Sequence, residues 1–151
     1  MRRIPRWLAR APIPLFRAGL GGVFAGVLVM VEHRGRTSGL PRYVVLEAVA
    51  AEPGAVVVPC GHRSRSQWFH NVQADPRVRL WRGRGAGVRA LAQVLPAAEA
   101  HELLDGYRRK HRARARLVAR AIGLPGLRAR DLLPADIDDR VALVRFATLP
   151  R

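Results

Sequence analysis

Two short segments of this chain carry side chains that could hold an anion. In the first, residues 34–42 (RGRTSGLPR), three arginines surround Thr37, Ser38 and Gly39. Guanidinium groups, hydroxyls and backbone N–H groups in a tight turn are the donors that bind phosphates and carboxylates. Taken alone, the segment is explained better by a solvated turn between two strands, because GRTSG matches neither of the common glycine-rich phosphate-binding motifs.

The second segment is residues 59–78 (PCGHRSRSQWFHNVQADPRV), where a strand, a basic loop and a helix follow one another. The N-terminus of a helix attracts anions, so a helix that begins near Gln67 could bind one. Trp68 and Asn71 are three residues apart and therefore share one helical face. The alternative is that Trp68 only anchors the helix to the core and that Asn71 makes a local hydrogen bond.

Composition limits what these segments could bind. The chain has 151 residues, which fits a single domain over 1–151, and its net charge is +16. That charge predicts attraction to nucleic acid, to an anionic membrane or to a phosphorylated ligand. Cys60 is the only cysteine, which excludes an intrachain disulfide and fits a reducing cytoplasm. The five histidines show no metal-ligand spacing, so no metal site is expected.

The elements that must position the two segments follow from turn signals and hydrophobic patterns. Proline residues confine the N-terminal helical segment, 1–20, to a short helix. Strands are expected over residues 24–33, 42–50, 55–59, 78–81, 88–95 and 140–147. Helices are expected over 67–74, with Ser64 or Ser66 as its cap, and over 97–123, which is long and basic. Short strands joined by hairpins predict a mainly β, α+β fold: an antiparallel barrel with helices packed outside.

The N-terminus has some features of a signal peptide, because a basic start precedes the uncharged residues 18–31. That apolar run is shorter than the roughly 20 residues that span a bilayer, and no clear cleavage site follows it. A core strand is therefore expected there. The alternative is peripheral contact with an anionic membrane through Trp7, Leu8 and Phe16.

Taken together, the two segments resemble the deazaflavin (F420)-dependent nitroreductase family, which are split β-barrel flavin/deazaflavin oxidoreductases. Family members typically read G-R-x-S-G-x-x-R, then a small-G-G loop, then P-x-W-x-x-N-L-x-A-N-P-x-V. The matching residues are Gly35, Arg36, Ser38, Gly39 and Arg42, then Gly61, Trp68, Asn71, Ala74, Pro76 and Val78. The resemblance covers residues 5–95. Cys60 and Ser66 depart from the pattern, and Glu47 stands where some nitroreductases have an active-site aromatic residue.

The resemblance implies an FMN-binding-like split β-barrel that binds coenzyme F420, with FMN as the alternative cofactor. It implies hydride transfer from the reduced deazaflavin to a small hydrophobic acceptor of the nitro, quinone or enone type. The cofactor-binding residues implied are Arg36, Thr37, Ser38, Gly39, Arg42, Cys60, Gly61, Gln67, Trp68 and Asn71. No residue is assigned as a catalytic acid or base, because the chemistry belongs to the cofactor.

Two other functions remain open at this stage. One is an FMN-binding oxidoreductase, or a cofactor carrier, of the same fold. The other is a basic protein without catalysis that associates with membranes or nucleic acid. The arginine-rich helix over residues 108–120 favours an anionic surface, but it lacks the interleaved aromatics that stack on bases, which disfavours nucleic acid. Barrels of this type often pair, so a homodimer is also expected, in the cytoplasm or at a membrane.

Overall fold

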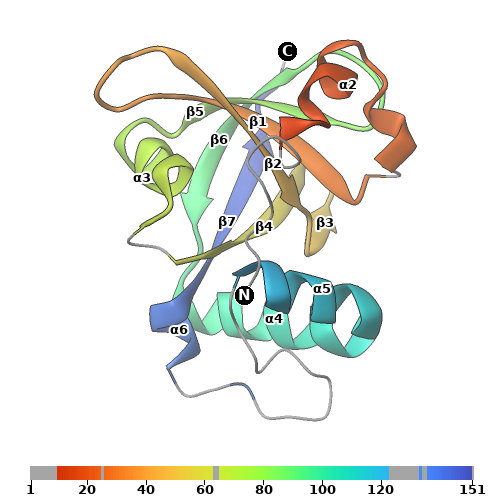
Figure 1. Ribbon diagram of the computed structural model, residues 1–151. Helices are drawn as coiled ribbons and strands as arrows, with labels where there is room; N and C mark the ends of the chain where they lie inside the picture. The colour runs from red at the N-terminus through yellow and green to blue at the C-terminus, as the bar shows by residue number, and fades with distance from the viewer. Residues whose placement is uncertain (1–9, 25, 63–64, 123–132, 134–135, 151) are drawn as a thin grey trace.

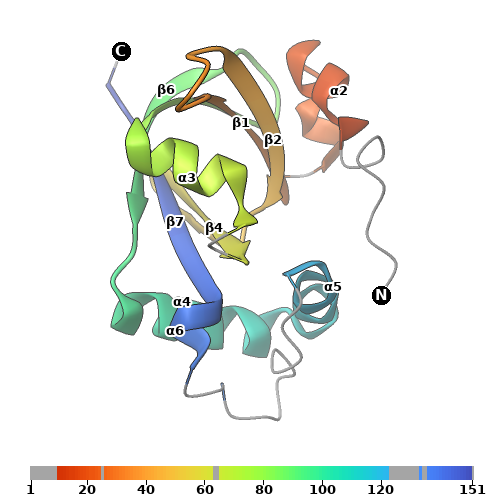
Figure 2. The same cartoon turned by 60° about the vertical axis from the view of Figure 1, so that its left-hand side comes forward.

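The computed structural model describes residues 10–24, 26–62, 65–122, 133 and 136–150. Its centre is one antiparallel sheet of seven strands, in the order β2-β1-β5-β6-β7-β4-β3 (Figure 1). The strands are β1 (Leu28–Arg34), β2 (Pro41–Glu47), β3 (Ala50–Glu52), β4 (Ala55–Gly61), β5 (Arg77–Arg82), β6 (Val88–Val94) and β7 (Val141–Thr148). The sheet curls into a split barrel with flanking helices (Figure 2), so the expected fold class is confirmed.

The inside of the barrel is apolar because alternate residues of each strand point inwards. In β5, Val78 and Leu80 are buried, whereas Arg77 and Arg79, which alternate with them, are exposed, as the alternating pattern predicts. The inward positions of the strands join Phe69 of helix α3 (Gln67–Ala74) in one core cluster. Helix α3 therefore covers the barrel from the side of β1 and β6 (Figure 2).

Strand β4 is buried on both faces, which explains its unbroken apolar run. Val56 and Val58 belong to the barrel core, and Val57 between them belongs to a second cluster. That second cluster contains residues of α4 (Ala97–Lys110), α5 (Arg112–Ile122) and α6 (Ile137–Arg140), which lie together below the sheet in Figure 1. Both layers thus meet at β4 and its neighbour β7.

Residues 42–50 were expected to form one strand, and this prediction is wrong. Strand β2 ends at Glu47, and β3 begins at Ala50 on the opposite edge of the sheet. The backbone N–H of Ala48 still bonds to Val27 O at 2.8 Å, but that of Val49 bonds to Val57 O at 2.9 Å. The chain therefore changes partner strands between two consecutive residues, and this crossing joins the two edges of the split barrel.

The prediction of a single long helix over 97–123 is also wrong, because α4 and α5 are separated at His111. A straight helix over that range would extend about 40 Å, nearly twice the length of a seven-residue strand. The bend instead returns α5 to the sheet, where Ala115 and Val118 are buried. No proline or glycine marks the bend, so tertiary packing and not local sequence places it.

Smaller differences lie at the ends of elements. The N-terminal helix is α2 (Ile13–Arg17), followed by a 3₁₀ turn η1 (Gly21–Phe24), and the first nine residues lie outside the described part. Phe16 is 1% exposed, which argues against the alternative of membrane contact through this side chain, while Trp7 and Leu8 lie outside the described residues. Helix α6 was not predicted.

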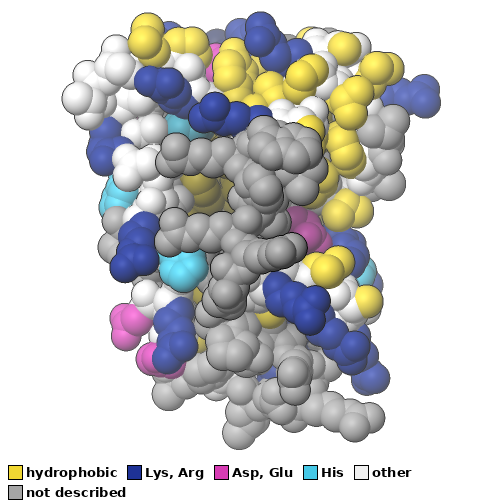
Figure 3. Space-filling model, in the orientation of Figure 1, with side chains coloured by type: hydrophobic (Ala, Val, Ile, Leu, Met, Phe, Trp, Pro, Cys, Tyr) yellow, Lys and Arg dark blue, Asp and Glu magenta, His cyan; other side chains and the backbone are white. Residues whose placement is uncertain are grey.

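No helix within the described part of the chain has the length and apolar character needed to cross a membrane. On the face drawn in Figure 3, lysine and arginine side chains greatly outnumber acidic ones, as the net charge of +16 requires. Among the residues that the structure describes, no cluster of histidine, cysteine and carboxylate side chains could hold a metal ion.

Candidate cofactor site

The two anion-binding segments of the sequence meet in space. Arg36, in the turn between β1 and β2, donates from Nη1 to Asn71 Oδ1 at 3.0 Å and to Gln67 Oε1 at 3.0 Å. The backbone N–H of Arg36 also donates to Asn71 Oδ1, at 3.1 Å. The turn is thereby fastened to the first two turns of α3, although 31 to 35 residues of chain separate the partners.

Asn71 is the buried centre of this junction. It is 6% exposed, and its Nδ2 group donates to Nδ1 of His33, which is 4% exposed. The distance is 3.2 Å, and the ring nitrogen must be unprotonated to accept. Burial lowers the pKa of His33 to about 4, and the charge of Arg42 acts in the same direction, while a hydrogen bond with the Arg34 backbone opposes it. His33 is therefore neutral at physiological pH and fixes the Asn71 amide so that Oδ1 faces Arg36.

The rest of the turn presents its donors to solvent. Thr37, Ser38 and Arg42 are exposed, and Arg42 has no hydrogen-bond or ion-pair partner among the described residues. Ser38 Oγ accepts from the N–H of Leu40 at 3.3 Å, which leaves its own O–H group available as a donor. Gly39 has φ of 67°, a left-handed conformation that favours glycine and closes the turn.

The remaining predicted site residues lie at the end of β4 and in α3. Gly61 ends β4, and Cys60 beside it is only 2% exposed, so Cys60 can offer a ligand little more than its backbone. Trp68 is half-buried: its ring packs against Phe69 and Phe146 at centroid distances of 6.0 and 6.4 Å. It anchors α3 to the barrel, while Gln67 and Asn71 of the same helix face the turn.

Only one of the two residues expected to cap α3 can be assessed. Ser66 occupies the N-cap position but makes no side-chain capping bond, and Ser64 lies outside the described residues. The turn before the helix is closed instead by His62, whose carbonyl accepts from the N–H groups of Arg65 and Ser66. An anion near this end of the helix would meet the positive end of the helix dipole.

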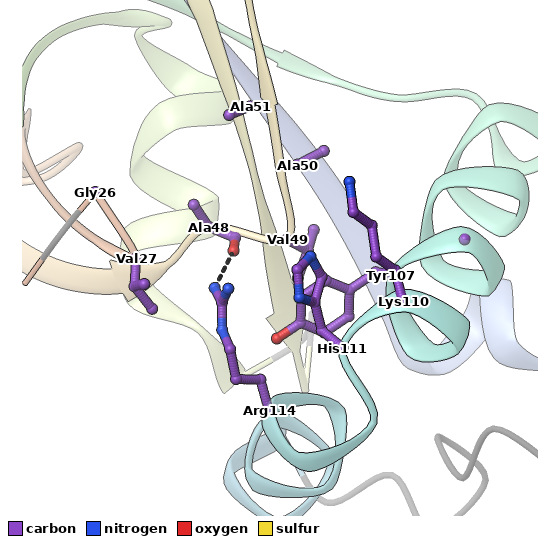
Figure 4. Close-up of a pocket in the computed structure, with 11 residues that line it drawn as sticks. Gly26, Val27, Ala48, Val49, Ala50, Ala51, Tyr107, Lys110, His111 and Arg114 are labelled. Carbon is purple, nitrogen blue, oxygen red and sulfur yellow. Dashed lines mark hydrogen bonds between the residues drawn. The ribbon is translucent and has the colours of Figure 1, made fainter.

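A pocket of about 380 Å³ lies at the other end of β2 (Figure 4). Its floor is the crossing segment between β2 and β3, and its wall is the bend between α4 and α5. The polar groups around it come from that bend. The lining residues are Gly26, Val27, Ala48, Val49, Ala50, Ala51, Gly106, Tyr107, Lys110, His111 and Arg114.

Three polar side chains lock the bend to β2. Tyr107 donates its hydroxyl to Glu47 Oε1 at 2.8 Å, and Arg114 Nε donates to the same oxygen at 3.2 Å. Arg114 also reaches the carbonyl of Ala48 at 3.3 Å, as Figure 4 shows, and lies over the Tyr107 ring. Burial, together with the bond to Glu47, raises the pKa of Tyr107 above its ordinary value, so the phenol stays protonated.

Sequence reasoning missed this cluster and missed His33. Two signals were present. Glu47 is the only acidic residue in an otherwise apolar strand run, and a half-buried carboxylate requires a partner. His33 precedes the GRTSG turn at the end of a buried strand, where a polar side chain must find a hydrogen bond.

The cluster predicts a stability effect. Glu47→Gln should lower the free energy of unfolding by about 1–2 kcal/mol, because Arg114 loses its ion-pair partner and Tyr107 a charged acceptor. Urea denaturation would measure the change. The control is Glu102→Gln in α4, because Glu102 is exposed and has no ion-pair partner in the described part. Equal stability of the two variants would contradict a structural role for Glu47.

Comparison with known proteins adds to this geometry. The model of a family described as F420H(2)-dependent quinone reductase matches residues 14–123. Among proteins with curated descriptions, none matches the chain.

Solved structures share the fold at low identity. An F420-H2 dependent reductase, FDR-A, is 20% identical, with 78% of this chain and 93% of that chain covered and a TM-score of 0.50. The heme storage protein HutZ from Vibrio cholerae is 10% identical, with 95% and 92% covered and a TM-score of 0.56. A protein described as a domain-swapped dimer is 16% identical, with 93% and 96% covered and a TM-score of 0.51.

Proposed function

The chain belongs to the F420H2-dependent quinone reductase family and is an F420-dependent oxidoreductase; we propose that its acceptor is a small, hydrophobic electrophile of the quinone, nitro or enone type. The observation that carries the site assignment is the junction of Arg36 with Gln67 and Asn71. It brings a cationic turn and the first two turns of α3 to one place, as an extended anionic cofactor needs.

The donors at the junction fit coenzyme F420. The coenzyme carries a phosphodiester and carboxylates, and the turn offers the exposed guanidinium of Arg42 together with the hydroxyls of Thr37 and Ser38. Arg36 uses Nη1 for the helix, and its Nε and Nη2 groups have no hydrogen-bond partner in the described part. We assign these groups to the phosphate and carboxylates, since guanidinium forks bind both in bidentate fashion.

The ribityl chain of the cofactor, with the edge of the ring that follows it, is assigned to the neighbouring wall. Gly39 shapes the turn, and Cys60 and Gly61 end β4 with backbone groups near the start of α3. Gln67, Trp68 and Asn71 would complete that wall, with Trp68 acting through the position of the helix. Reduced F420 supplies the hydride when bound, and the protein supplies position and electrostatics.

The pocket at the end of β2 is the proposed acceptor site. Strand β2 runs about 20 Å, over six residue steps, from the arginine turn to this pocket. A cofactor held at the turn by its anionic groups would therefore extend along the sheet and place its ring beside this pocket, because hydride passes only between atoms in contact. A quinone, nitro or enone oxygen gains negative charge when a hydride is added to the molecule. Lys110 and Arg114 line the pocket as cations and would stabilise that oxygen, while Val27 and Ala48–Ala51 supply apolar contact.

The acceptor assignment predicts a kinetic effect. Lys110→Gln should lower kcat by roughly tenfold or more, since removing one donor to a developing oxyanion commonly costs this much. Arg109→Gln is the matched control, because Arg109 is exposed, pairs with Asp105 at 2.9 Å and does not line the pocket. Steady-state oxidation of reduced F420 by a naphthoquinone would be followed. Equal kcat values for both variants would remove Lys110 from the acceptor site.

The proposed function is tested by titration and turnover together. Purified protein is titrated with F420 while the deazaflavin fluorescence is followed, then supplied with reduced F420 and a quinone, a nitroaromatic or a cyclic enone. Saturable binding with oxidation by at least one acceptor is expected. Binding without turnover would favour a cofactor carrier, and retention of FMN without affinity for F420 would contradict the proposal.

We further propose that the chain forms a homodimer in a reducing cytoplasm and contacts an anionic membrane peripherally. The likeness to a protein described as a domain-swapped dimer supports the first of these, and the charge of +16 supports the last. Analytical ultracentrifugation would decide the oligomeric state, and a monomer at micromolar concentration would contradict the dimer.

A further inference from the structure

The outer face of α5 carries a line of arginines. Arg112, Arg116 and Arg120 follow one another at steps of four residues, which places them on one side of the helix. All three are exposed, and in the described part of the chain no acidic side chain pairs with them. Figure 3 shows the blue side chains running along this helix at the lower right of the molecule. We call Arg112, Arg116, Arg120 and the leucine beside them, Leu117, the α5 face.

The neighbouring arginines differ because they have ion-pair partners within the fold. Arg108 and Arg109 both pair with Asp105, and Arg114 pairs with Glu47. These cations have an acidic partner within the fold, although two of them share Asp105. Apart from Lys110, which lines the pocket at the end of β2, the cations of residues 108–120 that have no ion pair in the described part are those of the α5 face, and their charges are left for an external partner.

Like charges at four-residue spacing repel and destabilise a helix by a few tenths of a kcal/mol per pair. Arg112 is also the first residue of α5, where the helix dipole disfavours a cation. The helix contains no acidic residue that could offset either effect. An anionic surface against the α5 face would reduce both the repulsion between the arginines and the unfavourable interaction of Arg112 with the helix dipole.

An exposed apolar side chain lies beside the line of arginines. Leu117 is 62% exposed, the most of any large hydrophobic side chain in the described part, and Ala113 one turn earlier is exposed as well. A line of cations around a protruding leucine suits the headgroup region of a bilayer, where arginines bind lipid phosphates and the leucine enters the acyl boundary. Nucleic acid offers no apolar layer for Leu117, and α5 has no aromatic residue that could stack on bases.

The geometry points to an anionic lipid surface as the partner: we propose that the α5 face docks the protein on membranes that contain acidic phospholipids. The opposite side of the same helix carries Arg114, which lines the pocket at the end of β2. Docking would therefore bring that pocket close to the lipid, from which a hydrophobic molecule could enter it. The docking itself does not depend on the function proposed for the pocket.

Vesicle co-sedimentation of the full chain tests the docking. Vesicles of phosphatidylcholine alone are compared with vesicles that contain roughly one quarter phosphatidylglycerol. The wild type should bind the anionic vesicles and not the neutral ones, with affinity that falls as salt rises. Changing Arg112, Arg116 and Arg120 together to glutamine should weaken binding by about tenfold or more.

The matched control changes Arg79, Arg84 and Arg89 to glutamine, which removes the same charge from exposed positions around β5 and β6. This variant should keep most of the vesicle affinity. Leu117→Gln should weaken binding at high salt as well as at low salt, because its contribution is apolar. Thermal unfolding by circular dichroism checks the folding of each variant, and loss of the three like charges on α5 should not destabilise it.

Several outcomes would overturn the proposal. They are failure of the wild type to bind anionic vesicles, equal losses in the α5 and control variants, and binding to a single-stranded oligonucleotide through the same arginines without vesicle binding. An unchanged affinity for Leu117→Gln would remove the leucine from the interface. Because these measurements need no cofactor, they stay separate from the F420 titration: either proposal can fail while the other stands.

Discussion

Replacing Arg36 and Arg42 together with alanine is expected to weaken binding of coenzyme F420 by roughly a hundredfold or more. Each guanidinium is proposed to make charge-assisted hydrogen bonds to the anionic part of the cofactor, and such bonds contribute about 1.5–3 kcal/mol each. Fluorescence titration of F420 at fixed ionic strength measures the loss.

The single variants separate binding from folding. Arg42 has no partner in the described part of the chain, so Arg42→Ala should weaken binding and leave the free energy of unfolding nearly unchanged. Arg36→Ala should weaken binding and also cost about 1–2 kcal/mol, because Gln67 and the buried Asn71 lose a hydrogen-bond donor.

The matched control for the double variant is Arg79→Ala with Arg89→Ala. These exposed residues face each other across β5 and β6, so the pair removes the same charge without touching the junction. An equal loss of affinity in this control would mean that F420 responds to overall charge. Full affinity in the Arg36/Arg42 variant would show that the turn is not part of the cofactor site.

The barrel itself could be predicted because local signals and the final structure agree along most strands. The alternation of β5 and the apolar run of β4 both reflect the face that each strand buries. Helix α3 begins at Gln67 and ends at Ala74, the bounds expected from the Asp75-Pro76 pair that follows it.

The departures share one cause, which is contact between distant segments. Ala48 and Val49 look like the middle of a strand, and only their bonds to Val27 and Val57 show that the chain changes partners there. The bend at His111 likewise depends on packing against the sheet. Sequence patterns do not identify the contacts of either segment, because these contacts are set by tertiary structure.

The junction was predictable only in part for the same reason. The motif identified Arg36 and Asn71 separately, but nothing in the sequence indicates that their side chains are hydrogen-bonded at 3.0 Å. His33 was invisible as a site residue because one histidine at the end of a strand is usually a satisfied structural residue. Its importance appears only when Asn71 is seen to accept from Arg36 and donate to His33 at once.

The chain His33–Asn71–Arg36 makes the junction sensitive to acid. Protonated His33 would present an N–H to the N–H of Asn71, and two donors cannot bond. Turning the amide over would satisfy His33, but it would set the Asn71 NH₂ group against the donors of Arg36. Burial is the main cause of the pKa of about 4 for His33, and this conflict between donors is a further reason why the folded protein resists its protonation.

This resistance predicts a loss of stability between pH 6.5 and pH 4. In the unfolded chain His33 takes up its proton near pH 6.5, while in the folded protein it does so only near pH 4. Between these values the unfolded state binds more protons, so the stability is complete above pH 6.5 and falls as the pH is lowered to 4. The loss should approach roughly 3 kcal/mol, measured as the free energy of unfolding in urea across that range.

His33→Asn isolates the contribution of His33. An asparagine Oδ1 can accept from Asn71 Nδ2 much as Nδ1 does, but it has no proton to gain in this range, so the variant should lose much less stability between pH 6.5 and pH 4. His101→Asn is the control, since His101 is exposed on α4, and it should follow the wild type. Two of the carboxylates that pair with arginines, Asp75 and Asp105, have lowered pKa values and lose their pairs only in stronger acid, outside this window. If His33→Asn kept the full pH dependence of the wild type, the acid sensitivity would lie elsewhere, and His33 would not be the residue that holds Asn71 towards Arg36.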